Sequence, residues 1–526
     1  MAAHWGGVAA VIGLYAIFLG VGWMGSRRVI QGTAAELLVA SRRMPFWMAT
    51  LTMAATWIDG GYLLGTAEGV FVNLASGWQG GVCFGLSLVL GGVFFARRMR
   101  QLRFVTLVDP LAARFGKHWA GILLIPALLG EVLWSAELLV AIGATLGVML
   151  GMDLVVAIIL SAAVVTLYTV WGGMWSVGYT DVVQFSLIPV GLLVAIPFAL
   201  DSAGGWDSCW RFYAERQGEA ARFVPPLDAG GYWTAPRIIS WWDLSIMLVA
   251  GGIPWNCYFQ RVQACQAPLK AQWHSIGAGL ITIAMTAPAA LLGLAAFGYA
   301  GWTPEAQEQL QRSPALALPL LLAEAVPPVV AVLGLAAIVG AVTSSFSASI
   351  LSAGSMVSWN LGRELLFPKL DLVGMRRLIR LSILALGVLA ALLALRVQSV
   401  QQLWFLTSDL VFVLLFPQLV YALFDPRANR TGSIVAFFAS LVLRLGAGEP
   451  LLRIAPWIDY ARIFGRLLPG GEEVWLDSSG HANLFPVRTL AALVGLVLLP
   501  LVSRITARWD PALPIPRPQD DDSTQS

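Results

Sequence analysis

The chain has 526 residues, of which 58% are hydrophobic and 12% are charged, and its net charge is +3. A mean hydropathy of +0.75 leaves too little polar surface to cover a water-soluble globule, so composition excludes a soluble enzyme and predicts a membrane protein. The four cysteines form no CxxC pair and indicate neither a disulfide framework nor a cysteine metal site.

Apolar segments of spanning length, about 20 residues each, predict an all-α polytopic membrane protein with about 13 transmembrane helices. The segments lie near residues 6–26, 46–71, 77–97, 119–150, 153–172, 178–200, 240–262, 273–298, 321–355, 377–396, 401–424, 432–447 and 487–505. Basic residues such as Arg27, Arg28 and Arg97 follow alternate segments. The positive-inside rule then places the N-terminus outside and the C-terminus in the cytoplasm.

The second segment contains the sequence Trp57-Ile58-Asp59-Gly60-Gly61-Tyr62, which indicates a helix interrupted at membrane depth. Two glycines next to a carboxylate expose backbone groups that lipid cannot satisfy. Such a break is tolerated only where it lines a cavity, and a transported solute is the natural occupant of that cavity. This segment therefore predicts a transporter.

A second interruption is predicted at Gly251-Gly252-Ile253-Pro254-Trp255, where proline removes a backbone donor. The two breaks lie five helices apart, as expected for an inverted-repeat transporter with broken first and sixth core helices. The predicted organisation in chain order is an N-terminal transmembrane helix and cytoplasmic linker (1–45), a first five-helix repeat (46–200), an extracellular loop (201–239), a second five-helix repeat (240–424), two additional helices with an extracellular loop (425–508) and a disordered cytoplasmic tail (509–526).

Aromatic residues recur near both breaks and could form a cage. They are Trp57 and Tyr62 at the first break, Trp255 and Tyr258 at the second, and Phe84, Trp134 and Trp404 on segments that could pack beside them. A quaternary ammonium has no N–H to donate, so aromatic faces or a carboxylate must hold its charge, at about 0.5–2 kcal/mol per cation–π contact. The alternative is that these tryptophans serve interfacial belts and helix packing.

Ionisable residues inside the apolar segments form a further group of candidates. They are Asp59, Glu68, Glu131, Glu137, Asp181, Asp409 and Arg261. Each costs about 2.5–3.5 kcal/mol at a helix centre, so each is expected to face the bundle interior and to pair or act. Asp59 is the best functional candidate because it lies within the break itself. The alternative is that backbone donors hold these acids, or that some lie nearer a helix end.

Hydroxyl groups cluster in the run 340–349, which includes Ser344 and Ser345. Hydroxyl and carbonyl oxygens suit a small hard cation, and the first break would release carbonyls at Ala55 and Ile58. These oxygens predict a sodium site. The alternative is a packing face whose serines bond back to their own helix.

Several stretches resemble the sodium:solute symporter family and, within it, the branch of high-affinity choline transporters. They are ATWIDGGYLLGTAE (55–68), TLVDP (106–110), IPALLGEVLW (125–134), VGYTDVVQ (177–184), GGIPWNCYFQRV (251–262), SSFSASILSAGSM (344–356), LWFLTSDLVFVLLFPQL (403–419) and LRLGAGEP (443–450). The resemblance implies a LeuT-like fold and sodium-coupled import by alternating access.

The resemblance also implies roles for individual residues. Trp57, Trp134 and Trp255 would box the quaternary ammonium, with Phe84 and Trp404 as flanking aromatics. Sodium would bind at Ala55, Ile58, Ala341, Ser344 and Ser345. A second sodium would bind at Asp181 with Ser344 and Ser347. Chloride dependence is implied as well, without ligands that can be assigned.

Two features depart from the animal choline transporters. Asp59 and Glu137 stand where those proteins have glycine and a small apolar residue, and Ser347 stands in place of an acid. An added carboxylate could tighten choline binding, select a primary or dibasic amine, or exchange protons, and we include both acids among the substrate-binding candidates. The sequence leaves these alternatives open.

Our hypothesis from the sequence is a sodium-driven choline transporter of a bacterial inner membrane. One alternative keeps the fold and changes the substrate to betaine, a carnitine-like zwitterion or a polyamine; a zwitterion would need a cationic partner, for which Arg261 is the nearby candidate. A sensor that does not move solute is disfavoured because no output domain is recognised. An enzyme is disfavoured because no nucleophile–base pair or metal-ligand spacing is found.

Overall fold

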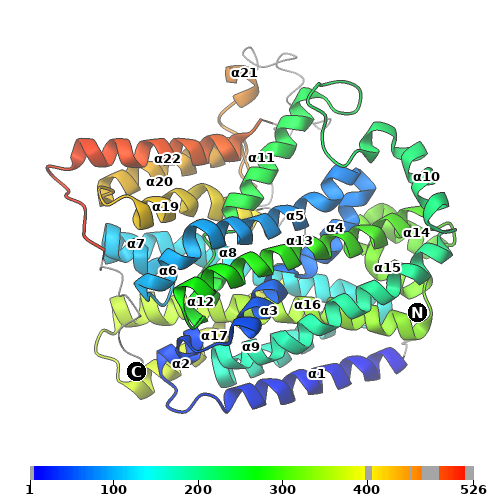
Figure 1. Cartoon of the computed structure of the whole chain (residues 1–526), viewed down its shortest axis with the longest axis horizontal. Helices are drawn as coiled ribbons and strands as arrows, with labels where there is room; N and C mark the ends of the chain where they lie inside the picture. The colour runs from blue at the N-terminus through cyan, green and yellow to red at the C-terminus, as the bar shows by residue number, and fades with distance from the viewer. Residues whose placement is uncertain (1–4, 397–405, 450–452, 465–484, 516–526) are drawn as a thin grey trace.

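A computed structural model describes residues 5–396, 406–449, 453–464 and 485–515, and these residues form a bundle of helices (Figure 1). Within these ranges there are three isolated β-bridges and no β-strand. The α-helices are α1 (Trp5–Ser26), α2 (Ala34–Val39), α3 (Phe46–Trp57), α4 (Gly60–Val72), α5 (Leu74–Leu90), α6 (Arg97–Leu102), α7 (Val108–Phe115), α8 (Lys117–Leu150), α9 (Leu154–Ser202), α10 (Trp206–Gln217), α11 (Ala235–Gly251), α12 (Asn256–Ala264), α13 (Pro268–Gly298), α14 (Pro304–Arg312), α15 (Ala317–Glu324), α16 (Pro328–Ser355), α17 (Leu372–Ala394), α19 (Phe416–Phe424), α20 (Arg430–Gly446), α21 (Tyr460–Phe464) and α22 (Val487–Thr506).

Helix ends coincide with the residues that favour them. Asn73 caps α5 by accepting a hydrogen bond from the Ser76 N–H at 2.7 Å, and Asp153 caps α9 in the same way. Proline occupies the first turn of α13, α14 and α16, where its missing N–H has no helical partner to lose. Gly151 ends α8 in the left-handed conformation, which favours glycine.

Ten helices in the described part of the chain are long and apolar enough to span a membrane, which confirms the prediction of an all-helical membrane protein. They are Gly6–Ser26, Leu74–Leu102, Lys117–Leu150, Leu154–Ser202, Ala235–Ala264, Pro268–Gly298, Pro328–Leu366, Leu372–Ala394, Leu406–Phe424 and Val487–Thr506. The other predicted segments correspond to α3 with α4, to one half of α9, and to α20, which has 17 residues. The count of thirteen stays a prediction.

Helix α9 is two helices joined by a reversal. Its 49 residues include Gly173 at φ 52° and ψ −133°, outside the helical region. The Gln184 amide donates a hydrogen bond to the Tyr168 hydroxyl at 3.3 Å, whereas a straight helix would separate residues 16 apart by about 24 Å. The two halves therefore lie side by side, as the separate predicted segments 153–172 and 178–200 require.

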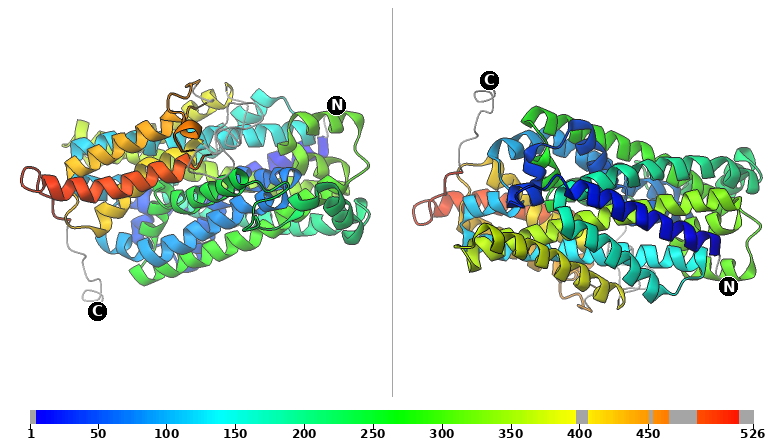
Figure 2. Two further views of the ribbon diagram at one scale, coloured as in Figure 1. Left: turned by 90° about the horizontal axis from the view of Figure 1, so that it is seen from above. Right: turned by 90° about the horizontal axis from the view of Figure 1, so that it is seen from below.

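The helices outside the two predicted repeats flank the bundle. Helix α1 runs along one side, and α20 and α22 lie along the opposite side (Figures 1 and 2). Helices α3, α4, α8, α12 and α16 lie between these flanks, and the points of interruption at Asp59 and Trp255 are buried inside the molecule.

Two predicted non-helical regions differ in the structure. The loop 201–239 contains helix α10. The tail is ordered at its start, so the prediction of disorder from residue 509 is wrong for residues 509–515. Asp510 accepts hydrogen bonds from the N–H and hydroxyl of Thr431, and the Leu513 carbonyl accepts one from Arg114 at 2.7 Å. The prediction for residues 516–526 lies outside the described residues.

Candidate functional site

The first interruption separates α3 from α4 and is capped by its own sequence. Ile58 leaves the helical conformation at φ −93° and ψ 75°. Asp59 then takes the N-cap position of α4, and its Oδ1 accepts a hydrogen bond from the Tyr62 N–H at 2.6 Å. The last carbonyls of α3 are left without helical partners and are available to other groups.

The second interruption separates α11 from α12 and is capped from elsewhere in the fold. Trp255 occupies the N-cap position of α12 and gives no side-chain cap. Oε1 of Glu131 on α8 instead accepts hydrogen bonds from the Cys257 N–H at 3.2 Å and from the Ser352 hydroxyl on α16. Asn256 adds a second connection to α16 by donating to the Ser355 hydroxyl at 2.9 Å.

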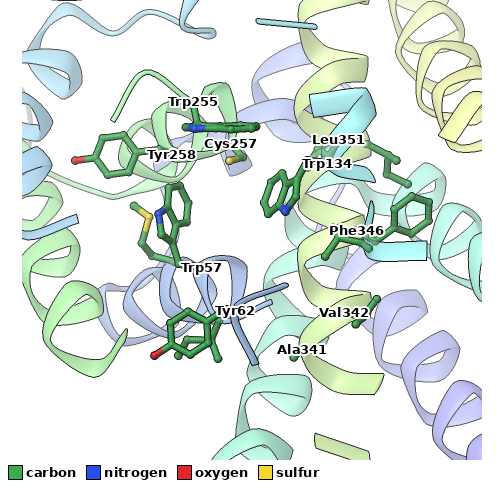
Figure 3. Packing of buried hydrophobic residues seen from close by; sticks show 14 of the residues in the cluster. Trp57, Tyr62, Trp134, Trp255, Cys257, Tyr258, Ala341, Val342, Phe346 and Leu351 are labelled. Atoms are coloured by element: carbon green, nitrogen blue, oxygen red, sulfur yellow. The ribbon is translucent and has the colours of Figure 1, made fainter. Parts of the chain in front are cut away.

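A small cavity lies between the two interruptions. It is lined by Thr56, Trp57, Asp59, Phe84, Trp134, Trp255, Cys257, Thr407 and Ser408. Figure 3 shows the indoles of Trp57, Trp134 and Trp255 turned toward a common space. The cavity volume of about 30 Å³ accommodates no more than about two water molecules. A quaternary ammonium therefore requires the rings to separate.

The aromatic rings meet edge to face. Trp134 and Trp255 have ring centroids 5.4 Å apart at an interplanar angle of 68°. The Trp134 indole N–H donates to Oδ2 of Asp59 at 2.7 Å, so the carboxylate fixes the orientation of this ring. Tyr258 packs against Trp57 with centroids 5.9 Å apart, and its hydroxyl is hydrogen-bonded to Ser275. Tyr258 therefore packs behind the Trp57 indole and is not among the residues that line the cavity.

Two further substrate-binding candidates lie away from the cavity lining. The Tyr62 hydroxyl donates to the Thr282 carbonyl on α13 at 2.6 Å and is hydrogen-bonded to Thr286, so it holds α4 against α13. Glu137 lies against the backbone of Gly61, close to Asp59. Neither carboxyl oxygen of Glu137 has a hydrogen-bond partner in the described part of the chain. The prediction for Trp404 falls outside the described residues.

Four residues that line the cavity were not predicted: Thr56, Cys257, Thr407 and Ser408. Thr56 and Cys257 directly adjoin predicted residues or a break, so adjacency was the available signal. Thr407 and Ser408 precede Asp409 on a segment whose position beside the cavity depends on tertiary packing.

Two of the predicted sodium ligands, Ser345 and Ala55, meet where α16 packs against the first break. The Ser345 hydroxyl donates to the carbonyls of Thr56 at 2.9 Å and Ala55 at 3.3 Å. Ala341 lies one turn before Ser345 on the same face of α16, whereas the adjacent Ser344 donates to the Asp181 carboxylate on α9. Hydroxyl and released carbonyl oxygens at such distances could hold a small hard cation. The Thr56 carbonyl is an additional oxygen at this position that was not among the predicted sodium ligands.

The predicted second sodium position already contains a positive charge. Ser344 donates to Oδ1 of Asp181 at 2.7 Å, and Oδ2 of Asp181 lies 3.5 Å from Nη2 of Arg261. The Ser347 hydroxyl donates to the Ser344 carbonyl of its own helix at 2.8 Å. The carboxylate at the predicted second sodium position is therefore already paired with a guanidinium.

Comparisons with known proteins agree with this architecture. High-affinity choline transporter 1 of Drosophila melanogaster is 36% identical over 507 residues, which cover 94% of this chain and 78% of that protein. High affinity choline transporter 1 of Homo sapiens is 36% identical over 503 residues, covering 93% and 83%. A solved structure described as the substrate-bound outward-open state of a Na+-coupled sialic acid symporter superposes with a TM-score of 0.76 at 19% identity, covering 96% of this chain and 98% of that one.

The family profile described as Sodium:solute symporter family matches residues 37–440. Together with relatives above 30% identity over most of the chain, this match assigns sodium-coupled solute symport as the class of activity. The protein is a transporter and not an enzyme. It belongs to the sodium:solute symporter family.

Proposed function

We propose that this protein imports choline together with sodium by alternating access around the two interrupted helices. The observation that carries the proposal is the cavity into which Trp57, Trp134 and Trp255 all turn, with the Asp59 carboxylate in its wall. Aromatic faces and a carboxylate are the groups that stabilise a cation without N–H donors. The similarity to high-affinity choline transporters supports the same substrate class.

The lining disfavours the alternative substrates. A betaine or carnitine-like zwitterion needs a cationic partner for its carboxylate, and no described residue of the lining is basic. Arg261 is paired with Asp181 and is not among the lining residues. A polyamine carries several ammonium groups, whereas Asp59 is the one acid among the described lining residues and each of its oxygens already accepts a hydrogen bond, from Tyr62 and from Trp134.

Sodium at Ala55, Ile58, Ala341, Ser344 and Ser345 would join α16 to the released end of α3. The serine-to-carbonyl contacts of Ser345 support this site. Coupling follows if sodium binds the substrate-accepting state better than the other state, because a ligand shifts an equilibrium only by its differential affinity. The inverted five-helix repeats, the outward N-terminus and chloride dependence stay predictions from the sequence.

A thermal-shift panel on the purified protein tests this proposal. Choline, betaine, carnitine and a polyamine are compared in sodium and in potassium. We expect choline alone to raise the melting temperature, and only in sodium, because a ligand at 100 times its Kd stabilises the native state by about 2.7 kcal/mol. If betaine raises the melting temperature and choline does not, betaine would take the place of choline as the proposed substrate. If choline raises the melting temperature equally in potassium and in sodium, sodium coupling would be overturned.

A further inference from the structure

Arg261 is fully buried at the junction of three helices. It lies on α12, and its Nε donates to the Thr52 carbonyl on α3 at 3.3 Å. Its Nη1 donates to the Cys257 carbonyl at 3.2 Å, and its Nη2 lies 3.5 Å from the Asp181 carboxylate on α9. These contacts fix the guanidinium in position, and the chain cannot release this charge as it would release a transported ion.

Each oxygen of the Asp181 carboxylate already has a partner within the protein. Both side chains of the pair have 0% exposure, so each charge needs the other in an environment that water cannot screen. Ser344 donates to the second carboxylate oxygen at 2.7 Å. Removing either charge would leave the other buried and unpaired.

A sodium ion at Asp181 would lie beside this guanidinium. Two positive charges a few ångströms apart repel strongly in a buried site, where the effective dielectric constant is low. The geometry at Asp181 therefore fits the guanidinium and does not fit a second sodium.

We propose that Arg261 takes the place of a second sodium as a fixed charge, so that one sodium ion accompanies each choline. The inference rests on the proposed function, in which sodium binds beside Ser345. It makes Arg261 the residue that sets the coupling ratio. It also explains why Arg261 is not free to bind a substrate carboxylate.

The coupling ratio of the wild-type protein decides the proposal. The protein is reconstituted into liposomes with fixed gradients of sodium and radiolabelled choline, and the membrane potential at which net choline flux stops gives the number of sodium ions per choline. A ratio of one supports the proposal, and a ratio of two overturns it. Choline flux that does not depend on the sodium gradient would instead overturn the proposed function.

Variants at the pair test whether Arg261 is the cause. Because Arg261→Gln leaves the Asp181 carboxylate unpaired, the Hill coefficient for sodium in choline binding is expected to rise from about 1 to about 2. Arg261→Lys keeps the positive charge, so its Hill coefficient for sodium is expected to stay near one. The double variant Asp181→Asn/Arg261→Gln removes both charges, and its Hill coefficient is also expected to stay near one. A folded Arg261→Gln protein that still takes one sodium would overturn the role of Arg261. If this variant does not fold, the wild-type ratio decides.

Discussion

The two interrupted helices reach the same cavity but are built differently. The first break supplies its own cap, because Asp59 accepts the Tyr62 N–H three residues later. The second break has an indole at the same position, and Glu131 from α8 accepts the Cys257 N–H instead. The first break is thus specified locally, whereas the second depends on a partner 126 residues away in the chain.

The difference assigns different chemistry to the two breaks. At the first break, α3 ends with carbonyl oxygens that the Ser345 hydroxyl contacts, and these oxygens belong to the proposed sodium site. At the second break, the Cys257 N–H at the start of α12 donates to the Glu131 carboxylate, so this break is stabilised by an acceptor that another helix supplies. Both breaks contribute an indole to the cavity, and only the first contributes a charge to its lining.

Replacement of the indole at the second break is expected to have the largest effect. Trp255→Ala should weaken choline uptake by about 30-fold or more, since a desolvated cation–π contact is worth about 2 kcal/mol. Uptake into liposomes at sub-saturating choline measures this loss. Trp242→Ala, on the exposed face of α11, is the matched control and should transport normally. Near-normal uptake by Trp255→Ala would remove the cage from consideration.

Removal of the Glu131 carboxylate, which caps α12 from another helix, should destabilise the second break. Glu131→Ala leaves the Cys257 N–H and the Ser352 hydroxyl without their acceptor, at a cost of about 1–3 kcal/mol in the free energy of unfolding. Glu131→Gln keeps an acceptor oxygen and should retain most of this stability. Melting temperatures in detergent without ligand compare the two, and equal values would contradict the proposed capping role.

Removal of the charge at the first break should reduce choline affinity without unfolding the helix. In Asp59→Asn the amide oxygen can still accept the Tyr62 N–H, because asparagine caps helices about as well as aspartate. We expect the Kd for choline to rise about tenfold, equivalent to about 1.4 kcal/mol. Asp153→Asn at the start of α9 is the control for capping alone. Unchanged affinity in Asp59→Asn would show that the carboxylate does not face the substrate.

The hydroxyl at the first break should affect sodium more than choline. Ser345→Ala is expected to raise the half-saturating sodium concentration about fivefold, or about 1 kcal/mol, while choline affinity at saturating sodium stays nearly constant. Ser349→Ala removes a hydroxyl one turn further along α16 that donates to the Glu131 carbonyl, and it serves as control. An unchanged sodium response in Ser345→Ala would exclude this site.

The smallest effect is expected at Glu137. Glu137→Gln should keep uptake and stability within about twofold of wild type, because it removes a buried acid that has no ionic partner to lose in the described part of the chain. Uptake and melting temperature measured on one preparation check this expectation. A large loss of uptake in a stable variant would give the carboxylate a part in binding or in proton exchange.

Local features of the sequence predicted much of the fold and part of the site. Composition and segment length predicted the spanning helices, and adjacent Gly, Asp and Pro residues predicted both interruptions. Five predicted residues line the cavity: Trp57, Asp59, Phe84, Trp134 and Trp255. Such features could be recognised because a broken helix and its cap involve neighbouring residues.

Tertiary structure alone decided which candidates share the site. Tyr62 looked equivalent to Trp57 in the sequence, yet its hydroxyl bonds to a carbonyl 220 residues away on α13. Asp181 looked like a sodium ligand, yet packing brings Arg261 against it from another helix. The physical reason is that a buried polar group must find a partner, and that partner is chosen by helix packing across the bundle and not by neighbours along the chain.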